Sequence, residues 1–117
     1  MAIQKFEDII AWQKAQDLAV NVYSTFRGAK DFGFRDQICR ASVSISNNIA
    51  EGFDRSSSAD FSRFLYISIA SCSEVKSMVY LAFRLDYISD GKKAELLSQS
   101  QEISKIIRGL IKSLNKN

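Results

Sequence analysis

The residue types that most often carry enzymatic or metal chemistry are scarce in this chain of 117 residues. It contains no histidine and only two cysteines, Cys39 and Cys72. Without histidine it cannot build a Ser-His-Asp or Cys-His mechanism, a histidine-ligated zinc or haem site, or the Glu-x-x-His di-iron site of ferritin-like bundles. The cysteines form no Cys-x-x-Cys pair, which argues against structural zinc and iron–sulfur clusters. We therefore expect no catalytic residues, no metal, no cofactor and no enzymatic activity.

Several polar side chains nevertheless lie in or beside the apolar faces of two predicted helices. A carboxylate in such a position must be paired, protonated or open to water, because burying a bare charge is very costly. The interpretation we favour is a structural network, in which Arg40 pairs with Glu51 or Glu74, and Asn48 bonds to Ser71. Two alternatives stay open: acid/base or metal-binding carboxylates, and an oligomer interface or central pore. The predicted network consists of Arg40, Ser44, Asn48, Glu51, Ser71 and Glu74.

Positive charge is concentrated at the end of the chain. Residues 1–90 hold ten basic and eleven acidic side chains, whereas residues 91–117 hold six basic and two acidic ones. On a helical wheel, Lys105, Arg108, Lys112 and Lys116 form a stripe opposite the apolar face. The stripe is either a solvated helix face or a patch that binds the phosphates of RNA or DNA. No aromatic residues are interleaved with these cations, so nothing in the pattern reads bases.

Apolar residues recur every three or four positions in four segments, which predicts helices at residues 8–27, 34–51, 56–88 and 92–114. Asp8 is the expected N-cap of the first helix, and Gly52 the expected stop of the second. Gly109 lies inside the fourth helix, where we expect close packing against a neighbour. Short connections then give an all-α, antiparallel up-down four-helix bundle, with residues 1–117 as a single domain.

The third predicted helix has two adjacent apolar faces, one through Phe64 and Met78 and the other through Leu65 and Val79. Two such faces, with exposed aromatic candidates elsewhere, are more than one four-helix core should need, which predicts a homo-oligomer. The aromatic candidates are Trp12, Tyr66 and Tyr80. The chain has neither a signal-peptide pattern nor an apolar stretch of spanning length, and its lone cysteines fit a reducing compartment. We expect a cytoplasmic protein without membrane contact.

One long stretch carries a family resemblance. QICRASVSISNNIAEGFDRSSSADFSRFLYISIASCSEV, residues 37–75, resembles the signature of the four-helix-bundle proteins encoded in intervening sequences of bacterial 23S rRNA genes, the S23-type ribosomal protein family. Residues 6–18 are also similar to the start of that family. The chain departs from the pattern at Ser46, where a proline is usual, and at Ala70, where a glycine is usual. The matching positions are Gln37, Ile38, Arg40, Ala41, Ser44, Ile45, Asn48, Ile49, Ala50, Glu51, Gly52, Arg63, Phe64, Leu65, Ser71 and Glu74.

The resemblance implies a bundle that assembles as a ring, a homopentamer, with no known catalysis. A related family, the accessory protein of diversity-generating retroelements, is similar in fold and binds nucleic acid and a reverse transcriptase through a basic surface. Together with the basic stripe, this predicts a non-enzymatic, oligomeric scaffold that binds the backbone of RNA or DNA and is associated with ribosomal RNA or a reverse transcriptase. The alternative is a protein–protein interaction scaffold that binds no nucleic acid.

Overall fold

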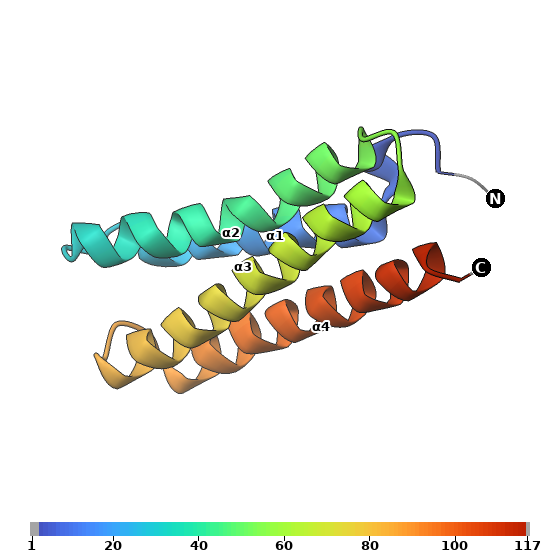
Figure 1. Ribbon diagram of the computed structural model, residues 1–117. Helices are drawn as coiled ribbons and strands as arrows, with labels where there is room; N and C mark the ends of the chain where they lie inside the picture. The colour runs from blue at the N-terminus through green and yellow to red at the C-terminus, as the bar shows by residue number, and fades with distance from the viewer. Residues whose placement is uncertain (1–2, 117) are drawn as a thin grey trace.

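Four long helices make up the structure, a computed structural model that describes residues 3–116. A short 3-10 turn at Phe6–Asp8 precedes α1 (Ile10–Phe26), α2 (Phe32–Phe53), α3 (Ser58–Arg84) and α4 (Asp90–Leu114). Connections of only a few residues make consecutive helices antiparallel, and both ends of the chain lie at the same end of the molecule (Figure 1). The described residues include no strand. The prediction of an all-α, four-helix fold is therefore confirmed.

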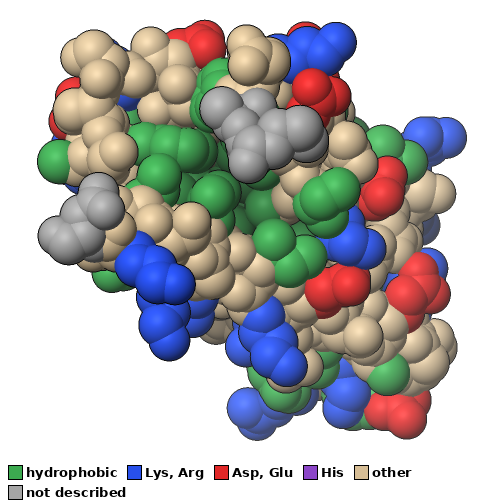
Figure 2. All heavy atoms as spheres, turned by 90° about the vertical axis from the view of Figure 1, so that its right-hand side faces the viewer, with side chains coloured by type: hydrophobic (Ala, Val, Ile, Leu, Met, Phe, Trp, Pro, Cys, Tyr) green, Lys and Arg blue, Asp and Glu red, His purple; other side chains and the backbone are tan. Residues whose placement is uncertain are grey.

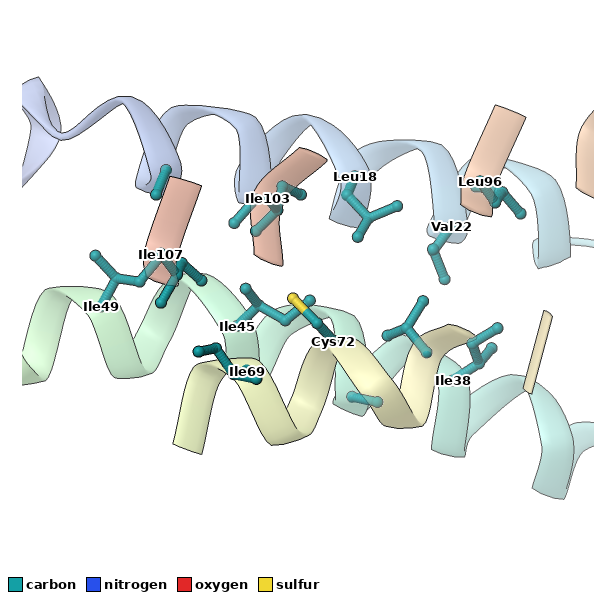
Figure 3. Packing of buried hydrophobic residues seen from close by; sticks show 14 of the residues in the cluster. Leu18, Val22, Ile38, Ile45, Ile49, Ile69, Cys72, Leu96, Ile103 and Ile107 are labelled. Atoms are coloured by element: carbon teal, nitrogen blue, oxygen red, sulfur yellow. The ribbon is translucent and has the colours of Figure 1, made fainter. Parts of the chain in front are cut away.

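The helices form an elongated bundle of 47 × 21 × 19 Å in which α1 packs on α2 and α4, and α3 packs on α2 and α4. Each helix turns a face of aliphatic side chains, three or four residues apart, toward the bundle axis (Figure 3). Burial of these side chains is the main force that holds the helices together. Among them are Leu18 and Val22 of α1, Ile38, Ile45 and Ile49 of α2, Ile69 and Cys72 of α3, and Leu96, Ile103 and Ile107 of α4.

Only one of the two apolar faces of α3 lies wholly in the core. The face through Leu65, Val75 and Val79 is fully buried. The other face lies at the edge of the bundle: Phe64 and Met78 are buried, whereas Ile67, Leu81 and Leu85 are 40–46% exposed. We call these three exposed side chains the apolar strip; Ser71 and the exposed Glu74 lie between Ile67 and Leu81, and Leu85 is the C-cap of α3.

The first two helices do not begin at the residues that the sequence predicts. Asp8 lies in the 3-10 turn, so its predicted role as N-cap of α1 is wrong, and the cap position is held by Ile9. The second helix begins at Phe32, earlier than predicted. There the carboxylate of Asp31 accepts a hydrogen bond from the backbone N–H of Phe34, and this bond satisfies one of the free amides of the first turn.

The third helix ends at Arg84, four residues before the predicted end. Asp86 adopts the left-handed conformation, with φ 61°. The N–H of Tyr87 then donates to the carbonyl of Ala82 at 2.8 Å, and this bond closes the helix end. An aspartate tolerates this conformation better than most residues do, so no glycine is needed here.

Two glycines have roles opposite to those predicted. Gly52 does not end α2 but lies buried in its last turn, where a Cβ would come within 2.6 Å of Cβ of Phe64 and 3.0 Å of Cδ1 of Phe61. Gly52 therefore allows the close approach of α2 and α3. Gly109 is exposed in α4, and a Cβ at this position would meet no atom of a neighbouring element within 4 Å, so the predicted close packing at Gly109 is wrong.

Two of the three aromatic residues predicted to be exposed are exposed. Tyr66 and Tyr80 are exposed as predicted, but Trp12 is not, because it packs against Phe6 with 5.3 Å between the two aromatic rings.

Cys39 and Cys72 are both free and buried. Burial raises the pKa of the Cys72 thiol to about 12, which leaves it unreactive at neutral pH. Within residues 3–116, no helix has the length and apolar character needed to cross a membrane.

Candidate nucleic-acid interface

Half of the predicted polar network forms, and Ser44 is its centre. The hydroxyl of Ser71 on α3 donates to the hydroxyl of Ser44 on α2 at 2.9 Å. The side-chain amide of Asn48 donates to the same hydroxyl at 3.0 Å and to the carbonyl of Ser44 at 2.8 Å. Asn48 and Ser71 thus meet through Ser44 rather than directly, and the contact links α2 to α3.

The charged half of the predicted network is wrong. Arg40, Glu51 and Glu74 are all exposed, and Arg40 makes no ion pair with either carboxylate in the described chain. Glu74 instead accepts a hydrogen bond from the side chain of Gln37 at 3.2 Å. The physical reason is the position of α3: its face through Glu74 lies at the edge of the bundle, where water solvates a carboxylate.

These carboxylates also do not belong to a cluster of possible metal ligands. Residues 3–116 contain no group of three or more cysteine, aspartate or glutamate side chains that could hold a metal ion. The predicted acid/base or metal-binding alternative for Glu51 and Glu74 thus gains no support from their geometry.

Two buried serines that the prediction left out of the network also join helices. Ser68 of α3 donates to the backbone carbonyl of Ile45 in α2 at 2.9 Å. Ser46, at the position where the family pattern has proline, accepts a hydrogen bond from the side-chain amide of Gln16 in α1 at 3.0 Å. A serine within an otherwise apolar face is the sequence signal that could have indicated both bonds.

The basic stripe is exposed along its whole length. Lys105, Arg108 and Lys112 lie on α4, and Lys116 follows the end of that helix. None of the four forms an ion pair with an acidic side chain among residues 3–116. Their positive charges are therefore available to an outside anion.

Three of these cations lie around a groove. Arg108, Lys112 and Lys116 line an open hollow of about 760 Å³ between the end of α4 and the first half of α3. Gly109, Ile111, Ser113 and Asn115 complete the α4 side of this hollow, which we call the α4 groove; no acidic residue lines it. Lys105 lies outside the lining, one turn along the same helix. Figure 2 faces the end of the bundle that carries both termini, with Lys and Arg side chains gathered at the lower left.

The α3 side of the groove is formed by Tyr66, which is 55% exposed. Sequence reasoning named Tyr66 as an exposed aromatic candidate but did not place it beside the basic stripe, because it lies 42 positions before Arg108. The spacing along the chain could have indicated this proximity. Residue 87 is the middle of the α3–α4 connection, and Tyr66 and Arg108 are equally far from it along the chain. In two antiparallel helices, residues equally far from the connecting turn lie level with each other.

A second hollow, of about 470 Å³, lies between α1 and α2 and is lined by Tyr23, Arg27, Arg35 and Arg40. It also contains Asp36, whose carboxylate pairs with Arg35 at 3.1 Å. The ion pair offsets part of the positive charge there. The α4 groove is the larger of the two and has no such acid.

Comparison with known proteins places the chain in a family. The family model of the 23S rRNA-intervening sequence protein matches residues 7–109. The chain belongs to this family. A crystal structure of a protein of unknown function from the S23 ribosomal protein family of Bacteroides thetaiotaomicron is similar, with 29% sequence identity and a TM-score of 0.83. The similarity covers 88% of this chain and 99% of the other. No curated protein matches the chain.

Proposed function

We propose that this 23S rRNA-intervening sequence protein is a non-enzymatic scaffold that binds the phosphate backbone of nucleic acid. The observation that carries the proposal is the α4 groove, where Arg108, Lys112 and Lys116 are exposed and no acidic side chain offsets them. Lysine and arginine bind phosphates by charge and release the counterions condensed on the nucleic acid. Such contacts favour any polyanion backbone and carry no sequence information.

The proposed scaffold is an assembly of several copies. The apolar strip of Ile67, Leu81 and Leu85 on α3 is a surface that a second copy would cover, and the family resemblance suggests five subunits in a ring. Repetition of the basic groove around such an assembly would strengthen binding, because several weak contacts to one strand act together. The expected setting is the bacterial cytoplasm, with ribosomal RNA or a reverse transcriptase as candidate partners.

A charge-reversal experiment tests the proposal. The triple variant Lys105→Glu, Arg108→Glu and Lys112→Glu should abolish binding of a fluorescently labelled RNA at low salt. All three side chains are exposed, so helicity and assembly size should stay as in the wild type. The control reverses three exposed cations outside the stripe and changes net charge equally: Lys5→Glu, Lys30→Glu and Arg84→Glu. Equal loss in both variants would show that net charge, not the stripe, attracts the nucleic acid.

The second candidate function is a protein–protein scaffold without nucleic-acid binding. The exposed apolar strip on α3 favours it, because apolar surface rimmed by polar residues is typical of protein interfaces. Salt separates the two functions. Nucleic-acid affinity falls steeply as salt rises, whereas contacts through an apolar strip are preserved.

A further inference from the structure

The α4 groove combines cations with an aromatic ring from another helix. Tyr66 of α3 lines it together with Arg108, Lys112 and Lys116. We propose that the groove prefers single-stranded nucleic acid and that one base of the strand stacks on the ring of Tyr66. This inference rests on the proposed function, since it presupposes that the cations hold a nucleic-acid backbone.

The position of Tyr66 fits a role in binding better than a role in the core. Its side chain is 55% exposed, whereas its chain neighbour Leu65 is fully buried and serves the core. The Tyr66 hydroxyl forms no hydrogen bond with another side chain or the backbone in residues 3–116. An exposed ring beside unpaired cations is the combination with which proteins hold single strands: the cations follow the phosphates and the ring stacks on a base.

The strand type follows from the chemistry of stacking. In a duplex the flat faces of the bases are covered by their neighbours, so Tyr66 could stack only after a base had been pulled out of the helix. A single strand presents its bases without that cost. Since every base has a flat face, the contact would be insensitive to sequence and common to RNA and DNA.

Gly109 gives the strand room to approach. It lies in the groove between Arg108 and the next turn, it is exposed, and the space that a side chain would occupy is empty. Arg108, Lys112 and Lys116 follow one another at four-residue intervals, a rise of about 6 Å each where the chain is helical. The cations therefore run along the groove in a line that an extended backbone can follow.

The ring of Tyr66 does not point in the same direction as Ile67 of the apolar strip. Successive residues of a helix point about 100° apart, so Ile67 faces a different direction from Tyr66. Tyr66 lies on the side of α3 that faces α4, as its place in the groove shows.

The test compares a single-stranded RNA with the duplex formed from the same strand, by fluorescence anisotropy at low salt. For Tyr66→Ala we expect single-strand affinity to fall about 5- to 100-fold, the range typical of losing one stacked base, with duplex affinity unchanged. Tyr66→Phe keeps the ring and should bind the single strand as the wild type does. A DNA strand of the same sequence should show the same loss with Tyr66→Ala.

Tyr80→Ala is the matched control, because Tyr80 is a 50% exposed tyrosine of α3 with Lys76 and Arg84 one turn away, but it does not line the groove. Single-strand affinity should stay at the wild-type level in this variant. The stacking proposal is overturned if Tyr66→Ala binds the single strand as tightly as the wild type, or weakens strand and duplex alike. If the wild type binds neither, the proposed function itself fails, and this result is distinct from the first two.

Discussion

Gly52 shows how one residue can determine the distance between two helices. It is part of the Asn-Ile-Ala-Glu-Gly motif, which by itself predicts a helix ending in glycine. In the fold this glycine is inside α2, and the atoms that a side chain would meet belong to Phe61 and Phe64 of α3. The motif glycine is therefore a contact residue between helices, and no periodicity in the chain reveals that.

Substitution of Gly52 and of Gly109 by alanine should change stability in opposite directions. Gly52→Ala should lower the free energy of unfolding by about 1–3 kcal/mol, because the new methyl group overpacks the contact with Phe64. Gly109→Ala should raise it by about 0.5–1 kcal/mol, because the position is exposed and alanine favours a helix. Urea unfolding measures both. A Gly52→Ala protein as stable as the wild type would contradict the close approach of α2 and α3.

Ser44 and Glu74 allow a second comparison at this scale. Ser44→Ala removes the hydroxyl that accepts from Ser71 and Asn48, although Asn48 keeps its bond to the Ser44 carbonyl, and should cost about 1–2 kcal/mol of stability. Glu74→Ala should change stability by less than about 0.5 kcal/mol, because Glu74 is exposed. Thermal unfolding of the two variants checks this ranking. A larger loss of stability in Glu74→Ala than in Ser44→Ala would contradict the exposed position of Glu74 and support the ion pair with Arg40 that the sequence predicts.

At the scale of helices, the sequence predicts their number and approximate extent because each must turn an apolar face to the core. It predicts their ends less well. Asp31 starts α2 and Asp86 ends α3, and both do so through hydrogen bonds or backbone conformations that many aspartates do not adopt. Periodicity also cannot decide which of two apolar faces of α3 is buried, since that depends on where α2 and α4 lie.

Two carboxylates, Asp31 at the start of α2 and Glu95 between α4 and α1, should make the free energy of unfolding fall in acid. The Tyr87 hydroxyl, which donates to Asp31 at 2.7 Å, and the Phe34 amide hold the pKa of Asp31 below its ordinary value of 3.8. Asn21 and Lys92 hold the pKa of Glu95 below 4.5. A carboxylate whose pKa is lower in the folded than in the unfolded protein stabilises the fold at pH values above its pKa in the unfolded protein. This stabilisation is lost as the pH falls through its pKa in the folded protein.

We therefore expect the urea midpoint to stay nearly constant between about pH 6 and pH 8, where no histidine titrates, and to fall below about pH 4.5. The Asp31–Tyr87 bond should also be lost in strong base, because the Tyr87 hydroxyl then loses the proton that it donates. The bond itself raises the pKa of Tyr87 above 10.0, so this loss occurs only above that pH. Tyr87→Phe should lessen the acid effect, since Asp31 loses its first partner. A midpoint that rises on acidification would contradict the assignment.

At the scale of the whole molecule, the two sides of the candidate site differ in how far sequence could predict them. Three of the four cations lie on α4 and Lys116 follows its end, so the face that the three share follows from helical geometry. Tyr66 enters the groove only because α3 and α4 pack antiparallel, which is a property of the tertiary fold. The charged half of the polar network failed for the same reason: a helical wheel gives an angle but not the surface that a neighbouring helix covers.

The apolar strip on α3 predicts self-association of the 13.2 kDa chain. Light scattering should give a mass of several subunits at micromolar concentration, with five as the family-based number. Leu81→Glu with Leu85→Glu should lower that mass, because both side chains are exposed and a charge there opposes an apolar interface. Helicity should persist. A wild-type protein that stays monomeric would contradict the assembly.

The salt dependence of RNA binding tests the central claim most directly. If the stripe binds phosphates, a plot of log affinity against log salt should be linear, with a slope of about −0.7 to −0.9 for each phosphate neutralised. If each of the four cations neutralises one phosphate, the slope should lie between about −2.8 and −3.6, and it should become shallower by about one for each cation removed. A slope near zero, or no binding to any polyanion at low salt, would show that the stripe is only a solvated helix face.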